Sequence, residues 1–216
     1  MHRGFFITFE GSEACGKSTQ IQLLADRFKQ LNFQVTLTRE PGGTPIGEEI
    51  RHLLQFSEAN AAMTPEAELL LFTASRAQLV REVILPSLAR GGTVIADRFF
   101  DSTTVYQGVA RAIDPAKVKL INEFAVGECR PDITFVLDLD CEVARQRLAG
   151  RKSPGVAKDR MEQEPLAFYE AVRQGYLNLA KAEPDRVKVI DAAGSIEAVH
   201  QEIWTRIESL LSVSSR

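Results

Sequence analysis

Five short apolar segments punctuate the chain, separated by stretches in which apolar residues recur at helical spacing. The segments cover residues 4–9, 33–38, 93–96, 133–139 and 187–190. The first, third and fourth are nearly continuous apolar runs, which is typical of strands buried on both faces. Strands that alternate with helices predict a parallel sheet covered by helices on both sides.

The predicted helices carry recognisable ends. Thr64 followed by Pro65 is a plausible N-cap with proline at the first helical position, and that helix should end near Pro86 or Gly91. A last helix is expected over about 195–211. Its apolar face, predicted to pack on the sheet, consists of Val199, Ile203, Ile207 and Leu210.

Two connections are too long for simple turns. Residues 40–62 begin with several prolines and glycines, and residues 150–165 contain Gly150, Pro154 and Gly155. Both are expected to be loops, and long loops in compact domains are usually functional or disordered. Both should lie near the carboxyl ends of strands, where open α/β sheets bind ligands.

Composition favours an ordinary globular α/β domain over residues 1–216. The chain is 44% hydrophobic and 25% charged, and its net charge of -3 argues against a nucleic-acid binder. No apolar stretch is long enough to cross a bilayer, and no signal peptide is expected. Cys15, Cys129 and Cys141 lack metal-ligand spacing, which suggests free thiols and a cytoplasmic protein.

The most informative motif is a phosphate-binding loop. Residues Gly11 to Ser18 read G-S-E-A-C-G-K-S, between a predicted strand and a predicted helix. Main-chain N–H groups of such a loop wrap nucleotide phosphates, Lys17 reaches the β- and γ-phosphates, and the Ser18 hydroxyl holds Mg²⁺. Cys15 is either a small loop filler or a thiol whose pKa the helix N-terminus lowers.

A second candidate element closes the third strand. Asp97 there could hold Mg²⁺ through water or take a proton from an attacking oxygen, and Arg98 could bind a second phosphate. The alternative is an ordinary Asp–Arg turn at a strand end.

Two further groups of residues are ambiguous by themselves. The segment 145–160 holds six cations (Arg145, Arg147, Arg151, Lys152, Lys158, Arg160) and one acid. It is either a cationic flap over a transferring phosphate or a solvated basic face. Phe72 and Arg76 share a helix face and would suit a nucleobase, but Phe72 could equally be core.

Together these pieces resemble the thymidylate kinase family over nearly the whole chain. The specific matches are T-R-E-P-G-G-T at Thr38 to Thr44, D-R-F at Asp97 to Phe99, Ser102-Thr103, and Tyr106-Gln107-Gly108. The resemblance implies a three-layer P-loop NTPase sandwich with a five-stranded parallel sheet. It also implies transfer of the ATP γ-phosphoryl group to dTMP.

The resemblance also implies roles for individual residues. Catalysis would involve Lys17, Asp97, Arg98, Arg151 and Arg160, and Mg²⁺ would be held by Ser18 and Asp97. ATP would meet Gly11, Ser12, Glu13, Ala14, Cys15, Gly16, Lys17, Ser18 and Thr19, together with Arg145 and Arg147. The dTMP site would comprise Glu13, Glu40, Arg51, Phe72, Arg76, Arg98, Ser102, Thr103, Tyr106 and Gln107.

Within that site, Phe72 would stack on thymine, Arg76 would hydrogen-bond its carbonyl edge, and Tyr106 would disfavour a 2′-OH. Ala14 stands where some members have arginine, so the chain resembles the bacterial-type arrangement with a basic lid at about 145–165. The family usually forms homodimers. The alternatives are a kinase for another acceptor, a nucleotide switch, and a scaffold with a vestigial site. A GTPase-type switch should carry an N-K-x-D motif for guanine, which this sequence lacks.

Overall fold

The frame of the protein is a five-stranded parallel sheet. The structure, a computed structural model, describes residues 4–150, 160 and 164–214. The strands are β1 (Phe6–Glu10), β2 (Val35–Arg39), β3 (Thr93–Asp97), β4 (Ile133–Asp138) and β5 (Val187–Asp191), in the order β2-β3-β1-β4-β5. Every pairing is parallel, so the predicted sheet is confirmed.

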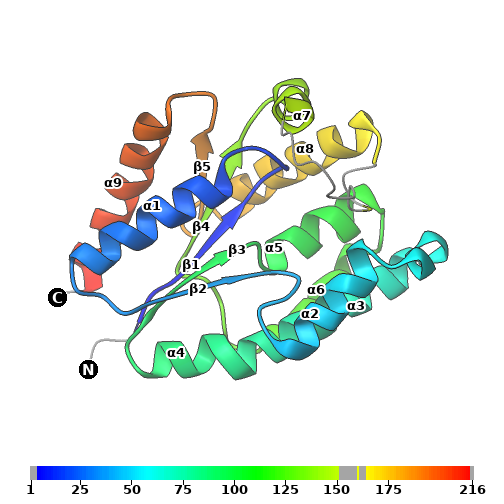
Figure 1. Ribbon diagram of the computed structural model, residues 1–216, viewed down its shortest axis with the longest axis horizontal. Coiled ribbons are helices and arrows are strands. Elements are labelled where there is room, and N and C mark those ends of the chain that lie inside the picture. Colours follow the sequence, from blue (N-terminus) through cyan, green and yellow to red (C-terminus); the bar gives the residue numbers. More distant parts are fainter. Residues whose placement is uncertain (1–3, 151–159, 161–163, 215–216) are drawn as a thin grey trace.

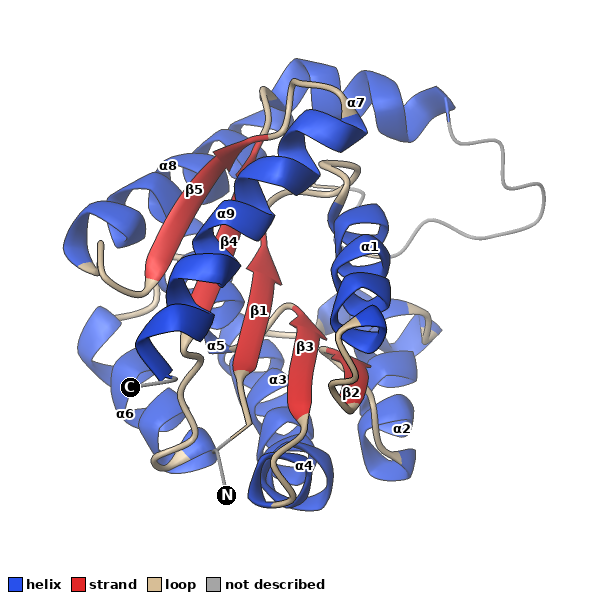
Figure 2. Cartoon of the chain, turned by 90° about the vertical axis from the view of Figure 1, so that its left-hand side faces the viewer, coloured by secondary structure: helices blue, strands red, loops and turns tan. Residues whose placement is uncertain are grey.

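Helices cover both faces of the sheet (Figures 1 and 2). Successive side chains of a strand point to opposite faces, so Ile7 and Phe9 of β1 pack against one helix layer and Phe6 against the other. The first layer consists of α1 (Lys17–Gln30) and α9 (Ile196–Ser214). The second contains α3 (Pro65–Leu79), α4 (Leu85–Ala89), α5 (Phe100–Thr103), α6 (Pro115–Val126) and α8 (Leu166–Ala182).

The last helix behaves as the sequence predicts. Val199, Ile203 and Ile207 of α9 are buried in the cluster that also holds Leu24 and Phe28 of α1. Burying several large apolar side chains stabilises the fold by about 1.5–3 kcal/mol each, before the entropy of ordering them is subtracted. The expected amphipathic face is confirmed.

The expectation of a loop over residues 40–62 is wrong. Residues in this range form α2 (Pro45–Gln55) and the 3₁₀ turn η1 (Glu58–Ala62). The Thr44 hydroxyl accepts a 3.0 Å hydrogen bond from the Gly47 N–H, and Pro45 occupies the first turn. These are the helix-start signals recognised at Thr64, but the glycines and prolines before them suggested a loop instead.

The helix that begins after Thr64 continues past Pro86 and ends near Gly91, the second of its two predicted ends. The Thr64 side chain accepts a hydrogen bond from the Ala67 N–H, which confirms the N-cap. After α3, the π-turn η2 (Val80–Ile84) leads directly into α4, which contains Pro86 and ends at Ala89. Gly91, with φ of 77°, then turns the chain towards β3. A π-turn widens the helix, and such turns occur mostly as single inserts.

The sheet brings the predicted motifs to one edge. Phe9 of β1 is paired with Asp97 of β3, so the phosphate loop and the Asp97–Arg98 turn leave neighbouring strands at the same end. The π-turn η3 (Thr104–Ala110) follows α5 on this side, and α7 (Cys141–Gly150) follows β4. In the described part of the chain, the helices fall short of the length and apolarity needed to cross a membrane.

Candidate active site

A cavity at the carboxyl edge of the sheet collects most of the predicted site residues. It is bordered by the phosphate loop, the end of β2, α2, α3, the Asp97–Arg98 turn and η3. The lining residues are Glu13, Ala14, Gly16, Lys17, Ser18, Arg39, Glu40, Pro41, Arg51, Gln55, Phe72, Asp97, Arg98, Ser102, Thr103, Tyr106 and Gln107. Residues predicted for both nucleotides therefore share one space.

The phosphate loop is wound around its own lysine. Lys17 Nζ donates to the carbonyl oxygens of Ser12 at 2.9 Å and Gly11 at 3.3 Å. Gly16, with φ of 100°, occupies the left-handed region at the start of α1, where a residue with a side chain would be strained. The loop thus presents a helix N-terminus and an ammonium group to the same space.

The charges around Lys17 keep it protonated. Burial and the nearby Arg98 would lower the pKa of the Lys17 ammonium. Cys15, Glu13 and Asp97 act in the opposite direction and hold that pKa above its ordinary value. Within the loop, Cys15 is buried, whereas Ser18 and Thr19 are exposed.

Arg98 stands at a strained point of the backbone. Its φ of 70° is in the left-handed region, which costs a residue other than glycine about 1–2 kcal/mol. Its Nη2 donates to Glu13 Oε1 at 2.6 Å, and its guanidinium carbon lies 5.1 Å from the centre of the Tyr106 ring. Burial alone would lower the pKa of Arg98, but Tyr106, Glu13 and other neighbours raise it.

Arg76 does not line the cavity, although the family resemblance predicted that it would hydrogen-bond the carbonyl edge of thymine. It is fully buried, and its Nε and Nη2 donate to Glu40 Oε2 at 2.8 and 2.6 Å. Asn122 and Thr103 accept further hydrogen bonds from it at 2.9 and 3.0 Å. Burial raises the pKa of Glu40 to about 7, although Arg76 acts against this. The pair ties α3 to the end of β2.

The remaining acceptor-side residues do line the cavity. Arg51 of α2 donates to the Pro41 carbonyl at 3.0 Å, and Phe72 of α3 is only partly buried. Gln107 of η3 donates to Glu68 Oε1 at 2.7 Å. A partly exposed ring and a buried amide thus line the same cavity, a combination of apolar and polar groups that is typical of small-molecule pockets.

The structure describes only part of the basic segment 145–160, namely residues 145–150 and residue 160. Arg145 and Arg147 lie on α7; Arg145 is exposed and pairs with Glu142 at 2.8 Å. Arg147 lies at 3.5 Å from the Ala192 carbonyl. Arg160 contacts Glu68 and lies at 3.4 Å from the Leu54 carbonyl, so it faces α2 and α3 and is not among the residues of the cavity. Arg151 lies outside the described residues.

Three buried residues that contact the lining of the cavity were not predicted from the sequence. Glu68 is 1% exposed. Its carboxylate forms ion pairs with Arg111 and Arg160 and accepts a hydrogen bond from Gln107. Glu10 and Tyr176 are likewise buried, behind Arg98. Glu10 lies next to the glycine loop, but the apolar pattern of β1 suggested only a strand end there. Tyr176 has no local signal, because its contacts come from distant parts of the chain.

The residues predicted to hold Mg²⁺ fit that ion. Asp97 Oδ1 is buried and has no hydrogen-bond partner among the described residues, and Ser18 lines the same cavity. The described residues contain no cluster of three or more His, Cys, Asp or Glu side chains suited to a metal. One carboxylate and one hydroxyl at the cavity match the needs of Mg²⁺, which usually takes one or two protein oxygens and completes its shell with phosphates and water.

A phosphate loop that faces a cation-lined cavity on a parallel sheet defines a P-loop kinase of small substrates. The family model described as "Thymidylate kinase" matches residues 9–203. The chain belongs to the thymidylate kinase family. Its reaction is therefore the ATP-dependent phosphorylation of dTMP to dTDP, a step in dTTP synthesis.

Relatives agree over almost the full length. The chain is 47% identical over 211 residues to a thymidylate kinase of Syntrophotalea carbinolica, with 97% of both chains covered. It is 48% identical over 209 residues to one of Halothermothrix orenii, covering 97% of this chain and 99% of the relative. A crystal structure of thymidylate kinase from Ehrlichia chaffeensis superposes with a TM-score of 0.75 at 36% sequence identity. The match covers 95% of this chain and 99% of that structure's chain.

The contacts of Glu68 predict a loss of stability in acid. Burial would raise its pKa, but hydrogen bonds from Gln107 and Arg160 and the charge of Arg111 lower it below the ordinary value of 4.5. The stability contributed by this carboxylate is therefore present above pH 4.5 and is lost as the pH falls through the lowered pKa. Urea unfolding at several pH values should show a weaker acid dependence for Glu68→Gln than for wild type. Parallel pH dependences would contradict the prediction.

Proposed function

We propose that phosphoryl transfer occurs by in-line attack of a dTMP phosphate oxygen on the γ-phosphorus of ATP, across the cavity between the phosphate loop and Arg98. The observation that carries this proposal is the shared lining of Lys17, Asp97 and Arg98. Two polyanions must approach each other there. A phosphate oxygen is already anionic at neutral pH, so catalysis consists mainly of positioning and charge neutralisation.

On the donor side, Lys17 would exchange loop carbonyls for ATP phosphates. The carbonyls of Gly11 and Ser12 accept hydrogen bonds from its ammonium. A phosphate oxygen is a stronger acceptor than a neutral carbonyl. The exposed hydroxyl of Ser18 and the carboxylate of Asp97 would hold Mg²⁺, which when bound neutralises charge on the β- and γ-phosphates.

On the acceptor side, Arg98 and Arg51 would bind the dTMP phosphate. Each has an exchangeable partner at the cavity, Glu13 for Arg98 and the Pro41 carbonyl for Arg51. Phe72 would stack on thymine, with Thr103 and Gln107 beside it. Arg76, which is buried behind the cavity lining and held by Glu40, would hydrogen-bond the carbonyl edge of thymine. Glu13, released from Arg98, would face the sugar 3′-OH.

We further propose that this is a member with a basic lid at about 145–165, within one domain spanning residues 1–216. Ala14 leaves the phosphate loop without an arginine, so basic residues of that segment would complete the ATP site. In this arrangement Arg151 is the candidate to reach ATP. Arg160 would have to leave Glu68 to do so. The three free cysteines support a reducing, cytoplasmic location.

A homodimer would cover an apolar face formed by α3 and α6. Phe124 is 83% exposed, Leu120 is 68% exposed and Leu70 is 56% exposed. Leu120 and Phe124 are four residues apart on α6 and so share one face, and α6 packs beside α3. Exposed apolar side chains gathered on adjacent helices favour a protein interface. We propose a second copy of the chain as the occupant.

Arg98→Ala should lower kcat/KM for dTMP by about 100-fold or more, because a charged donor to the transferring phosphate is lost. ATP binding, measured by calorimetry, should stay nearly intact. Arg90→Ala, at an exposed arginine after α4, serves as the control and should behave like wild type. Comparable dTMP turnover in the Arg98 variant would refute the assignment.

Tyr106→Ala should weaken discrimination against a 2′-OH. The ring is 7% exposed and would crowd that position, so the ratio of kcat/KM between dTMP and its ribose counterpart should fall by about 10-fold. Tyr106→Phe keeps the ring and is the matched control. An unchanged ratio in the alanine variant would remove Tyr106 from this role.

Phe124→Glu should convert the dimer into a monomer, because it places a charge in the apolar face. Sedimentation or light scattering would report the mass at several protein concentrations. Leu31→Glu, at an exposed leucine after α1 on the other side of the sheet, is the control and should leave the mass unchanged. A monomeric wild type, or a dimeric Phe124 variant, would contradict the proposed interface.

A further inference from the structure

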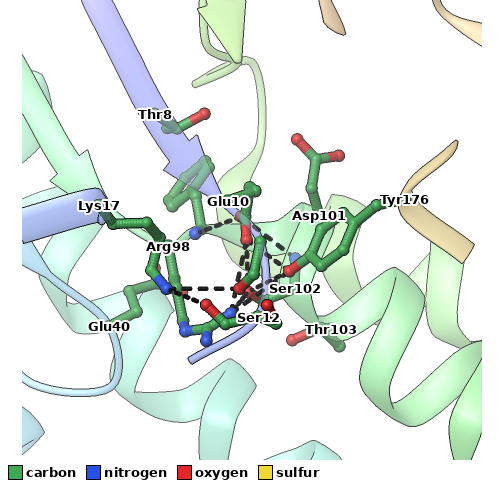
Figure 3. Close-up of polar contacts among 12 residues, drawn as sticks. Thr8, Glu10, Ser12, Lys17, Glu40, Arg98, Asp101, Ser102, Thr103 and Tyr176 are labelled. Atoms are coloured by element: carbon green, nitrogen blue, oxygen red, sulfur yellow. Dashed lines mark hydrogen bonds and ion pairs between the residues drawn. The ribbon is translucent and has the colours of Figure 1, made fainter. Parts of the chain in front are cut away.

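The carboxyl group of Glu10 lies directly behind the Arg98 turn (Figure 3). Glu10 is the last residue of β1 and is fully buried, and Tyr176 of α8 is 2% exposed. Neither lines the cavity assigned to the nucleotides. They are therefore outside the set of residues expected to touch substrate, and their contacts point to Arg98 instead.

Glu10 accepts four hydrogen bonds from two sides. Its Oε1 accepts from the main-chain N–H groups of Phe99 at 2.8 Å and Ser102 at 3.2 Å. Its Oε2 accepts from the hydroxyls of Ser102 at 2.6 Å and Tyr176 at 2.7 Å. Four donors around one carboxylate favour its charged form, although burial and the nearby Asp101 raise the pKa of Glu10.

The main-chain bonds hold the backbone on the carboxyl side of Arg98. On its amino side, the Arg98 N–H donates to the Phe9 carbonyl at 2.9 Å. Arg98 has φ of 70°, a conformation that persists only where the surroundings enforce it. The end of β1 provides both anchors, one through the Phe9 carbonyl and one through the Glu10 carboxylate.

The same group also orients the guanidinium. Arg98 Nη1 lies 4.0 Å from Glu10 Oε2, and within 3.3 and 3.4 Å of the Ser102 and Tyr176 hydroxyls. Arg98 Nη2, in contrast, binds Glu13, whose side chain is 34% exposed. The Nη1 edge of the guanidinium is thus held by the buried Glu10 and Tyr176 and the half-buried Ser102, while Nη2 contacts a carboxylate at the cavity.

We propose that Glu10, with the Tyr176 hydroxyl, is a positioning residue that holds the backbone and the Nη1 edge of Arg98, so that Nη2 is aimed at the acceptor phosphate. This inference rests on the proposed role of Arg98 in binding that phosphate. Glu10 contributes in two ways, by accepting the hydrogen bonds that hold the turn and by placing its carboxyl group 4.0 Å from the Nη1 atom of the guanidinium.

Two conservative variants separate these contributions from general stability. Tyr176→Phe removes one hydroxyl and keeps the ring that packs beside Tyr106. Glu10→Gln keeps an oxygen for the Phe99 and Ser102 N–H groups, and its amide can donate to the two hydroxyls, which are also acceptors. The glutamine variant therefore preserves the shape of the turn and removes the charge.

Both variants should lower kcat with dTMP by about 10-fold, because the donor to the phosphate is displaced. The KM for ATP should stay unchanged, since the contacts of Lys17 are not altered. Asp101→Asn is the structural control: it weakens the buried ion pair of Asp101 with Arg186, in the same segment of chain. This variant should have a lower melting temperature than wild type, while its kcat should stay within about twofold of the wild-type value.

A double-mutant cycle with Arg98→Ala distinguishes a role through Arg98 from an independent one. If Glu10 and Tyr176 act through Arg98, then Tyr176→Phe and Glu10→Gln should have no further effect on kcat in the Arg98→Ala background. Equal fold losses in both backgrounds, wild-type kcat in both single variants, or an equal loss in Asp101→Asn would overturn the positioning role. Unimpaired dTMP turnover by Arg98→Ala alone would instead overturn the role proposed for Arg98. Should Glu10→Gln fail to fold, the cycle with Tyr176→Phe tests the same coupling.

Discussion

The active site depends on the parallel pairing of β1 with β3. Phe9 pairs with Asp97, so the glycine loop and the arginine turn leave the sheet side by side, although these two residues are 88 positions apart in sequence. α1 is held on the sheet by Leu24 and Phe28, which sets the place of Lys17 at its first turn. A shift in this register would separate the two phosphate-binding elements, whatever the local sequence of each.

A second organising principle is that several arginines in and around the cavity are paired with carboxylates of the chain itself. Arg98 has Glu13 and Glu10, Arg76 has Glu40, and Arg160 shares Glu68 with a neighbouring arginine. An unpaired ion out of water is costly by several kcal/mol, so a site built to accept polyanions needs internal anions until the ligand arrives. The carboxylates differ in burial, and this difference decides which of them a ligand can replace.

Much of this could be predicted from the sequence. Apolar periodicity predicted the five strands and the packing face of α9, and the G-x-x-x-x-G-K-S motif predicted the phosphate loop. The helix α2 was missed because glycines and prolines just before Thr44 suggested an irregular segment, although Thr44 and Pro45 start a helix. Burial of Arg76 beneath the cavity was not predictable, since it depends on Glu40 from another strand end. Long-range partners such as Tyr176 leave no local pattern.

The ion pair between Arg98 and Glu13 has a consequence for selectivity among anions. The Glu13 carboxylate is an internal competitor that occupies the guanidinium at 2.6 Å whenever no ligand does. A stray inorganic anion offers a single contact and must displace a tethered group whose local concentration is high. A nucleotide that also engages the walls of the cavity recovers that cost through its sugar and base. We therefore expect the pair to weaken the binding of small anions more than the binding of large, multiply anchored ligands.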